Sequence, residues 1–340
     1  IQRAIPKVMV MADRNERRET FILNRGLYNQ PGEAVAAGVP TALPPLAKAE
    51  APNRLDLAQW LIRDDHPLTA RVTVNRLWQT FFGAGLVRTP GDFGSQGQPP
   101  SHPELLDWLA RRFIDSGWDV KALVRTMTLS EAYGRSVRIS PQALAVDPEN
   151  KWLARAPRHR LPSWMIRDQA LAAAGLLSSR LGGAPVNGYQ PEGVWEEFTF
   201  GKKTYRRDDG EKLYRRSLYT FWRRIIGPTI FFDAAKRQTC EVAPKRTNTP
   251  LQALVTLNRT TYVEAARWLA QGALEQGDPT DGIEWMFQRL LARAPEPEEV
   301  EILTRRFDAL SAAFSERPEA VSQLLNVGAS PVDAARSPID

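Results

Sequence analysis

Five consecutive polar or basic residues stand directly before a strong helix start. They are Lys245, Arg246, Thr247, Asn248 and Thr249. Thr249 can cap the helix, Pro250 suits its first turn, and Gln252 has the spacing that completes a capping box. A helix N-terminus exposes unpaired N–H groups and a partial positive charge, to which Lys245 and Arg246 add full charges. The 245–249 loop is therefore a candidate site for a sulfate, carboxylate or phosphate.

The same pattern also has a purely structural interpretation. The helix could simply cap itself, with Arg246 held by an ion pair to Asp233. Asp233 and Arg237 stand four residues apart, so on a helical turn they would form an ion pair. With Arg246 they could instead form a carboxylate–guanidinium network beside the 245–249 loop. The single cysteine of the chain, Cys240, excludes an internal disulfide and is expected to be buried and inert.

A second set of polar residues recurs at helical spacing in the first half of the chain. Arg71, Asn75 and Gln79 would share one helix face, which could look toward His102 and Asp107. Such a face could bind a ligand, but it could also be a solvated surface or a buried structural network. The spacing of the three histidines does not indicate a metal site, and we predict none.

Positive charge is concentrated in one segment. The net charge is +6, from 45 Lys and Arg against 39 Asp and Glu, and residues 202–224 alone hold nine basic and three acidic residues. This local field favours an anionic polysaccharide or an acidic protein face as partner. Nucleic acid is not favoured, because no recognised motif accompanies the charge. Alternatively, the segment is a solvated loop whose basic residues pair with acids elsewhere.

Aromatic residues precede and enter this basic segment. They are Tyr189, Trp195, Phe198, Phe200 and Tyr205. With the basic residues they could form a sugar-binding surface. Glu196 and Glu197 resemble paired catalytic carboxylates, but neighbours on a strand would point to opposite faces.

The patterning around these residues predicts a mainly α fold with a few short β-strands. Apolar runs at 8–11 and 20–23 flank a charged turn and predict an N-terminal hairpin, followed by a Pro- and Ala-rich linker over 31–52. Residues 213–222 alternate loosely and predict one mid-chain strand. Helices are predicted from 53, over 67–82, from a Ser101 cap, from Asp119, and over 163–181, 249–271 with a bend near 258, 281–293, 297–314 and 319–325.

These elements divide the chain into four parts. Residues 1–52 form the hairpin and linker, 53–140 a first helical subdomain, 141–330 a second helical part with the basic segment, and 331–340 a tail. No run approaches the about 18 apolar residues that a membrane-spanning helix needs. Because the chain begins at Ile1, we expect it to be a piece of a longer protein.

Several blocks occur in an order typical of one family. They are residues 55–61, 66–72, 74–79, 85–94, 100–110, 232–240 and 247–254. Through these blocks the chain resembles, over nearly its whole length, the planctomycete-type family called domain of unknown function 1553. Members often carry histidines where this chain has Thr80 and Phe81, which argues against a metal-ligand or haem-ligand role for that helix.

The resemblance implies a context rather than a reaction. Such domains usually lie at the C-terminal end of exported, periplasmic or otherwise extracytoplasmic proteins, often near a c-type cytochrome-like domain. It implies no cofactor in this chain, with haem c elsewhere in the parent protein or on a c-type cytochrome partner. The other domains of the parent protein are further implied partners.

Two hypotheses for function remain open on these grounds. In the first, the domain acts with a c-type cytochrome in the oxidation or breakdown of polysaccharide. In the second, it is a non-catalytic scaffold that binds an anionic glycan or a partner through the basic segment. The sequence does not decide whether the chain is an enzyme.

Overall fold

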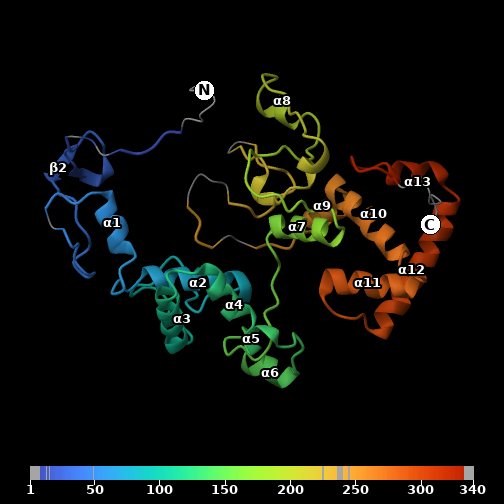
Figure 1. Cartoon of the computed structure of the whole chain (residues 1–340), viewed down its shortest axis with the longest axis horizontal. Coiled ribbons are helices and arrows are strands. Elements are labelled where there is room, and N and C mark those ends of the chain that lie inside the picture. The colour runs from blue at the N-terminus through green and yellow to red at the C-terminus, as the bar shows by residue number, and fades with distance from the viewer. Residues whose placement is uncertain are drawn as a thin grey trace. The chain divides into compact units, whose positions relative to one another are not determined.

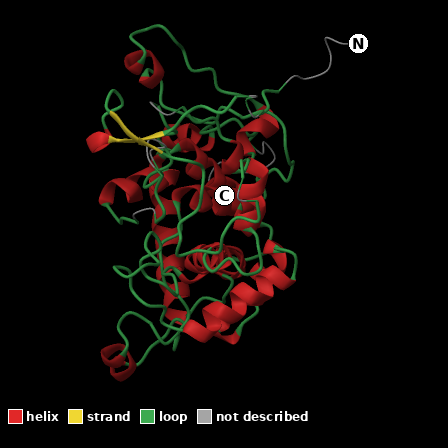
Figure 2. Ribbon diagram, turned by 90° about the vertical axis from the view of Figure 1, so that its left-hand side faces the viewer, coloured by secondary structure: helices red, strands yellow, loops and turns green. Residues whose placement is uncertain are grey.

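The computed structural model describes residues 8–12, 14, 16–48, 50–223, 226–235, 240–243 and 246–332. The chain divides into two compact units, unit 1 (Ile1–His159) and unit 2 (Arg160–Asp340). The described residues form thirteen α-helices and one two-stranded sheet, so the predicted mainly α fold with few short strands is confirmed (Figure 1; Figure 2). Among the described residues, no helix has both the length and the apolar content that crossing a membrane requires.

The sheet is a short N-terminal hairpin whose strands differ from the prediction. β1 (Phe21–Leu23) pairs antiparallel with β2 (Pro31–Ala34), and the 3-10 turn η2 (Asn24–Gly26) begins the connection. The strand predicted at 8–11 is wrong, because these residues are exposed and lie in no strand. The reversal that starts at η2 is short, so it brings the beginning of the predicted linker against β1.

Unit 1 is built around three helices that pack together. They are α2 (Thr69–Phe82), α3 (Pro103–Asp115) and α4 (Val120–Thr128) (Figure 1). Apolar residues recur every three or four positions, so each helix buries one face in a common core. Its most buried members include Val74, Trp78, Leu106, Leu109, Phe113, Leu123 and Met127.

The helix ends of unit 1 follow local signals. Asp119 caps α4 as predicted, whereas the predicted Ser101 cap is wrong. The N-cap of α3 is His102, one residue later than predicted. The Ser101 hydroxyl forms a hydrogen bond with the His102 ring at 3.0 Å instead. Three shorter helices complete the unit: α1 (Arg54–Leu61), α5 (Glu131–Gly134) and α6 (Pro141–Val146).

Unit 2 centres on α10 (Thr260–Leu274), which packs against α7 (Ser163–Ala173) and α11 (Pro279–Leu291). The other helices of the unit are α8 (Val194–Phe198), α9 (Pro250–Asn258), α12 (Pro297–Ser315) and α13 (Pro318–Leu325). Arg259 separates α9 from α10 with an extended backbone, which confirms the break predicted near residue 258. The helix predicted over 163–181 is too long, because Gly175 adopts φ 75° and the chain turns away after α7.

The mid-chain strand predicted over 213–222 is wrong. The segment forms the 3-10 helices η3 (Gly210–Tyr214) and η4 (Ser217–Tyr219). Isolated β-bridges join Arg215 to Ser178 and Thr220 to Val186. The buried guanidinium of Arg167 donates to the carbonyl oxygens of Leu213 and Arg215 at 2.8 and 2.9 Å. These bonds replace the ladder that a strand would need.

Leu109→Ala should destabilise unit 1 by about 2–5 kcal/mol, because it removes fully buried methyl groups and leaves a cavity. Leu129→Ala is the matched control, since the Leu129 side chain is 75% exposed, and should change stability by less than about 0.5 kcal/mol. Urea denaturation followed by far-UV circular dichroism measures both. Equal effects of the two substitutions would contradict the assignment of the core.

Candidate ligand-binding site

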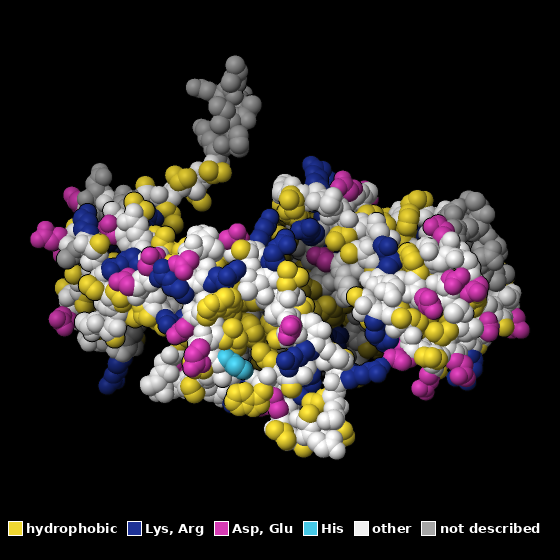
Figure 3. Space-filling view, turned by 60° about the horizontal axis from the view of Figure 1, so that its bottom comes forward, with side chains coloured by type: hydrophobic (Ala, Val, Ile, Leu, Met, Phe, Trp, Pro, Cys, Tyr) yellow, Lys and Arg dark blue, Asp and Glu magenta, His cyan; other side chains and the backbone are white. Residues whose placement is uncertain are grey.

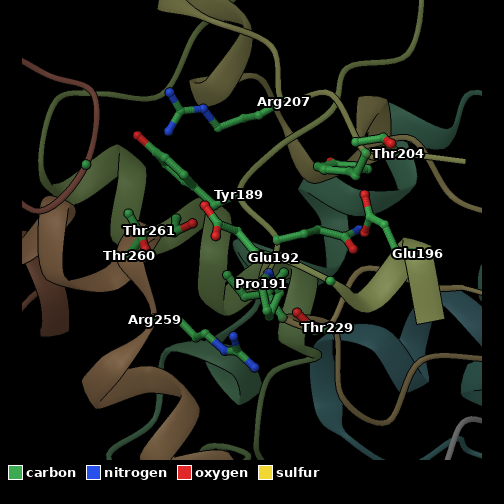
Figure 4. Close-up of a pocket in the computed structure, with 15 residues that line it drawn as sticks. Tyr189, Pro191, Glu192, Glu196, Thr204, Arg207, Thr229, Arg259, Thr260 and Thr261 are labelled. Carbon is green, nitrogen blue, oxygen red and sulfur yellow. The ribbon is translucent and has the colours of Figure 1, made fainter. Parts of the chain in front are cut away.

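Unit 2 contains a pocket of about 710 Å³ in which aromatic, hydroxyl and charged side chains meet. We call it the Tyr189 pocket, and its lining side chains include Tyr189, Glu192, Glu196, Thr204, Tyr205, Arg207, Thr229, Arg259, Thr260 and Thr261. They come from the segment before α8, from α8 itself, from two loops and from the start of α10 (Figure 4). The fold therefore gathers parts of unit 2 that are distant in sequence.

Buried Trp195 organises the segment that carries much of this pocket. Its ring centre lies 5.4 Å from that of Tyr205 and 6.0 Å from that of Phe221. The Tyr205 hydroxyl donates to the Gly188 carbonyl oxygen at 2.8 Å. Burial, with the negative charge of Asp208, raises the pKa of Tyr205 to about 12, so this phenol keeps its proton at neutral pH. The shape of the pocket thus depends on aromatic packing more than on regular secondary structure.

The pocket combines two carboxylates with two guanidinium groups. They belong to Glu192, Glu196, Arg207 and Arg259. The Arg207 guanidinium lies 5.2 Å from the centre of the Tyr189 ring. In Figure 4, Arg207 and Arg259 lie at opposite ends of the pocket, with Glu192 between them. Arginine forks bind carboxylate and sulfate groups, and carboxylates accept hydrogen bonds from hydroxyl groups.

A fully buried carboxylate lies directly behind the wall of the Tyr189 pocket. Oε1 of Glu264 accepts from the Tyr214 hydroxyl at 2.9 Å. It also accepts from the backbone N–H groups of Ala329 and Ser330 at 2.9 and 2.7 Å. Oε2 has no hydrogen-bond partner among the described residues. Burial and the negative charge of Glu264 raise the pKa of Tyr189, whose hydroxyl accepts from Ala329 N–H at 2.8 Å.

Comparison with known protein families identifies the family of the chain. The family model PSD1, Protein of unknown function (DUF1553), matches residues 53–307. The chain belongs to the DUF1553 family. No curated protein and no solved structure matches it. The DUF1553 match includes every residue of the Tyr189 pocket named above, whereas Gly328, which also lines the pocket, lies beyond it.

In this DUF1553 chain, residues 247–249 before α9 are held by hydrogen bonds within unit 2. Thr249 and Gln252 make the predicted capping box at α9. The Asp233 carboxylate accepts from the Thr247 N–H at 2.7 Å and from the Gln252 amide at 3.2 Å. Burial opposes ionisation of Asp233, but the hydrogen bonds from Thr247 and Gln252 lower its pKa overall. No Arg246–Asp233 ion pair occurs among the described residues.

Of the other residues of this predicted site, one forms a side-chain hydrogen bond, one is partly buried and two lie outside the described residues. The Asn248 side-chain oxygen accepts from Arg160, whose guanidinium lies 5.2 Å from the centre of the Phe232 ring. Burial lowers the pKa of Arg246. Arg237 and Lys245 lie outside the described residues. Anion binding at the 245–249 loop therefore stays a prediction.

The second predicted set, which includes Arg71, Asn75 and His102, lies in unit 1. Arg71 donates to Asp107 at 2.6 Å, which lowers the pKa of that carboxyl. Asn75 is fully buried, and both ends of its amide bond the backbone of Val87 at 2.8 and 3.0 Å. These contacts agree with the alternative that this helix face is a structural network. A ligand role stays a prediction for Arg71, Asn75, Gln79 and His102. His102 lines a separate pocket of unit 1.

The basic segment is not a uniform exposed patch. Arg215 is buried, donates to the Arg180 carbonyl oxygen at 3.1 Å and lies 3.8 Å from the centre of the Tyr219 ring. Lys212 pairs with Asp208 at 3.0 Å. Arg207 instead lines the Tyr189 pocket.

Several pocket residues had no distinguishing signal in the sequence. Tyr189, Glu196, Tyr205 and Arg207 fall in the aromatic and basic runs that we noted, but Arg259 and Thr261 only follow a helix break. The prediction for Cys240 is wrong, because this residue is exposed in a surface loop. Over the described ranges, no group of three or more His, Cys, Asp or Glu side chains could hold a metal ion.

Asp233→Asn should cost about 1 kcal/mol of stability at pH 7, because an amide cannot replace both carboxylate acceptors. The pKa of Asp233 is lowered in the folded state from its ordinary 3.8. Its contribution is therefore present above about pH 4 and disappears as the pH falls through the folded-state pKa. Denaturation at pH 7 and pH 3 should show the difference between variant and parent shrinking. Asp308→Asn on exposed α12 is the control, and a difference that grows in acid would contradict this account.

Gly328→Ala should loosen the segment that closes the Tyr189 pocket. Gly328 has φ 100°, and a Cβ there would lie 2.4 Å from the Glu264 carboxyl group. We expect a loss of about 1–3 kcal/mol and faster hydrogen exchange at the amides of Ala329 and Ser330. Gly188→Ala is the control, because a Cβ there meets nothing within 4 Å. Unchanged exchange at both amides would show that the clash is relieved elsewhere.

Proposed function

We propose that unit 2 of this DUF1553 chain binds an anionic saccharide in the Tyr189 pocket. The observation that carries the proposal is the placement of Arg207 and Arg259 at opposite ends of a pocket with aromatic walls. Each guanidinium can bind a carboxylate or sulfate group in a bidentate manner. Two such groups at the ends of one pocket suit a ligand that carries repeated negative charges.

The other lining residues support a sugar rather than a simple ion. The rings of Tyr189 and Tyr205 offer flat apolar surface of the kind on which the C–H faces of a sugar ring pack. Glu192 and Glu196 accept hydrogen bonds from hydroxyl groups, and the hydroxyls of Thr229 and the start of α10 can donate or accept them. A pocket of about 710 Å³ has room for more than one sugar ring.

The family resemblance supports a setting for this binding. In that setting the domain belongs to an exported protein, and the haem of a c-type cytochrome domain or partner performs any oxidation. The proposal for this chain is limited to binding, since carbohydrate recognition does not require a catalytic group. The second hypothesis, a non-catalytic scaffold, allows either an anionic glycan or a protein partner, and only its protein-partner form predicts no saccharide affinity.

Calorimetric titration with oligogalacturonate and with sulfated dextran tests the proposal, with neutral dextran of similar length as reference. We expect binding of the anionic probes that weakens with added salt, and none of neutral dextran. Arg207→Ala and Arg259→Ala should each weaken binding about tenfold, equivalent to about 1.4 kcal/mol. Arg206→Ala is the matched control, because Arg206 is an exposed neighbour that does not line the pocket.

Equal affinity for neutral and anionic dextran would overturn the role of the two arginines. Unchanged affinity of both arginine variants for the anionic saccharides would show that the binding site lies outside the Tyr189 pocket. A complete lack of saccharide binding would overturn the proposal and would leave the form of the scaffold hypothesis in which the partner is a protein.

A further inference from the structure

A separate pocket in unit 1 takes no part in the proposed saccharide binding. It has a volume of about 470 Å³ and lies between the end of α2, the start of α3 and the loops up to residue 159. We call it the His102 pocket. All of its lining residues belong to unit 1.

Basic groups dominate the polar lining of the His102 pocket. They belong to Arg88, Lys151, Arg155 and Arg158, and the one lining carboxylate is that of Glu149. Glu149 lies 3.5 Å from Arg88 and is largely exposed. Arg155 donates to two backbone carbonyl oxygens at 3.1 and 2.8 Å, and no carboxylate among the described residues forms an ion pair with it.

Asp147 is the other acid near this lining, and its carboxylate is turned to the backbone. It accepts from the N–H groups of Lys151 and Trp152 at 2.7 and 2.8 Å. Burial opposes its ionisation, but these bonds and the charges of Arg155 and Arg88 lower the pKa of Asp147 overall. Four bases against two acids leave an excess of positive charge around the pocket.

Another part of the lining of the His102 pocket is apolar. Trp78 and Phe82 stack with their ring centres 3.9 Å apart, and both line the pocket together with buried Leu86. Leu144 and Leu153 add further apolar surface. An anion without an apolar part would leave this surface in contact with water, so the pocket suits an organic anion rather than an inorganic one.

Two histidines, His102 and His159, also line the pocket. The Ser101 hydroxyl bonds Nδ1 of His102 at 3.0 Å, so Nε2 is the ring nitrogen left for a ligand. His159 packs so closely on Gly83 that a Cβ there would lie 2.8 Å from its Nδ1. Figure 3 shows one face of the molecule, on which hydrophobic side chains gather with basic and acidic side chains around them.

We propose that the His102 pocket binds an organic anion, in which a carboxylate or phosphate group meets the arginines and a ring-sized apolar body contacts Trp78 and Phe82. The charged group and the apolar body together explain why both kinds of lining occur in one pocket. The anionic dye 8-anilinonaphthalene-1-sulfonate has both features and serves as the probe.

Fluorescence titration of the full chain with this dye tests the proposal. The double variant Lys151→Glu, Arg158→Glu should weaken dye binding at least about tenfold, because it reverses two charges around the pocket. Neither side chain has a hydrogen bond or ion pair among the described residues, so the fold should persist, as circular dichroism can verify. Arg76→Glu, Lys121→Glu makes the same change in net charge on exposed faces of α2 and α4 and should leave binding unchanged.

Competition then identifies the anionic group. Benzoate and phenyl phosphate should both displace the dye, and the stronger competitor reports whether a carboxylate or a phosphate is preferred. Benzyl alcohol, which lacks the charge, should not compete at the same concentration. Equal dye binding by the two double variants, or competition by benzyl alcohol, would overturn the proposal. Loss of dye binding in Arg207→Ala would place the dye in the Tyr189 pocket and would also overturn it.

Discussion

The hydrogen bonding of the Glu264 carboxylate holds unit 2 together around its pocket. A buried carboxylate is costly unless donors surround it, and here a phenol and two backbone N–H groups bond one oxygen. These donors come from η3 and from the segment after α13. The helix α10 can bury this charge only when both partners are in place, so the carboxylate couples their folding.

The same face of α10 holds the segment after α13 through further contacts. Arg267 donates to the carbonyl oxygens of Ser330 and Pro331 at 3.0 and 3.1 Å, and the Trp268 indole donates to the Ser330 hydroxyl at 2.8 Å. Residues three and four positions apart lie on one helix face, so Glu264, Arg267 and Trp268 act on the same segment. A stretch without regular secondary structure is therefore ordered by side chains of one helix, and it completes the wall of the Tyr189 pocket through Gly328.

Buried polar side chains also explain why the candidate sites were hard to recognise. Asn75 and Arg167 have the residue types of a ligand site, but each satisfies backbone groups that lack a partner in regular secondary structure. From spacing alone, a helix face that binds a ligand and one that binds a loop are identical. The polar stripe containing Asn75 was predictable, but its contacts with Val87 were not, since they depend on where the 84–88 loop packs.

Local signals in the sequence were sufficient for the family, the mainly α fold, the Thr249–Gln252 capping box and the helix break near residue 258. The capping box and the helix break depend on residues only a few positions apart, whose hydrogen bonds and backbone preferences are local. The family instead follows from blocks that occur in a fixed order between residues 55 and 254. Two other features depend on contacts between segments that are distant in sequence. They are the replacement of the predicted strand by η3 and η4, and the placement of Arg207 and Arg259 in one pocket. Only the packed chain decides these, because burial selects among local conformations of similar energy and brings together side chains whose separation in sequence carries no information about distance.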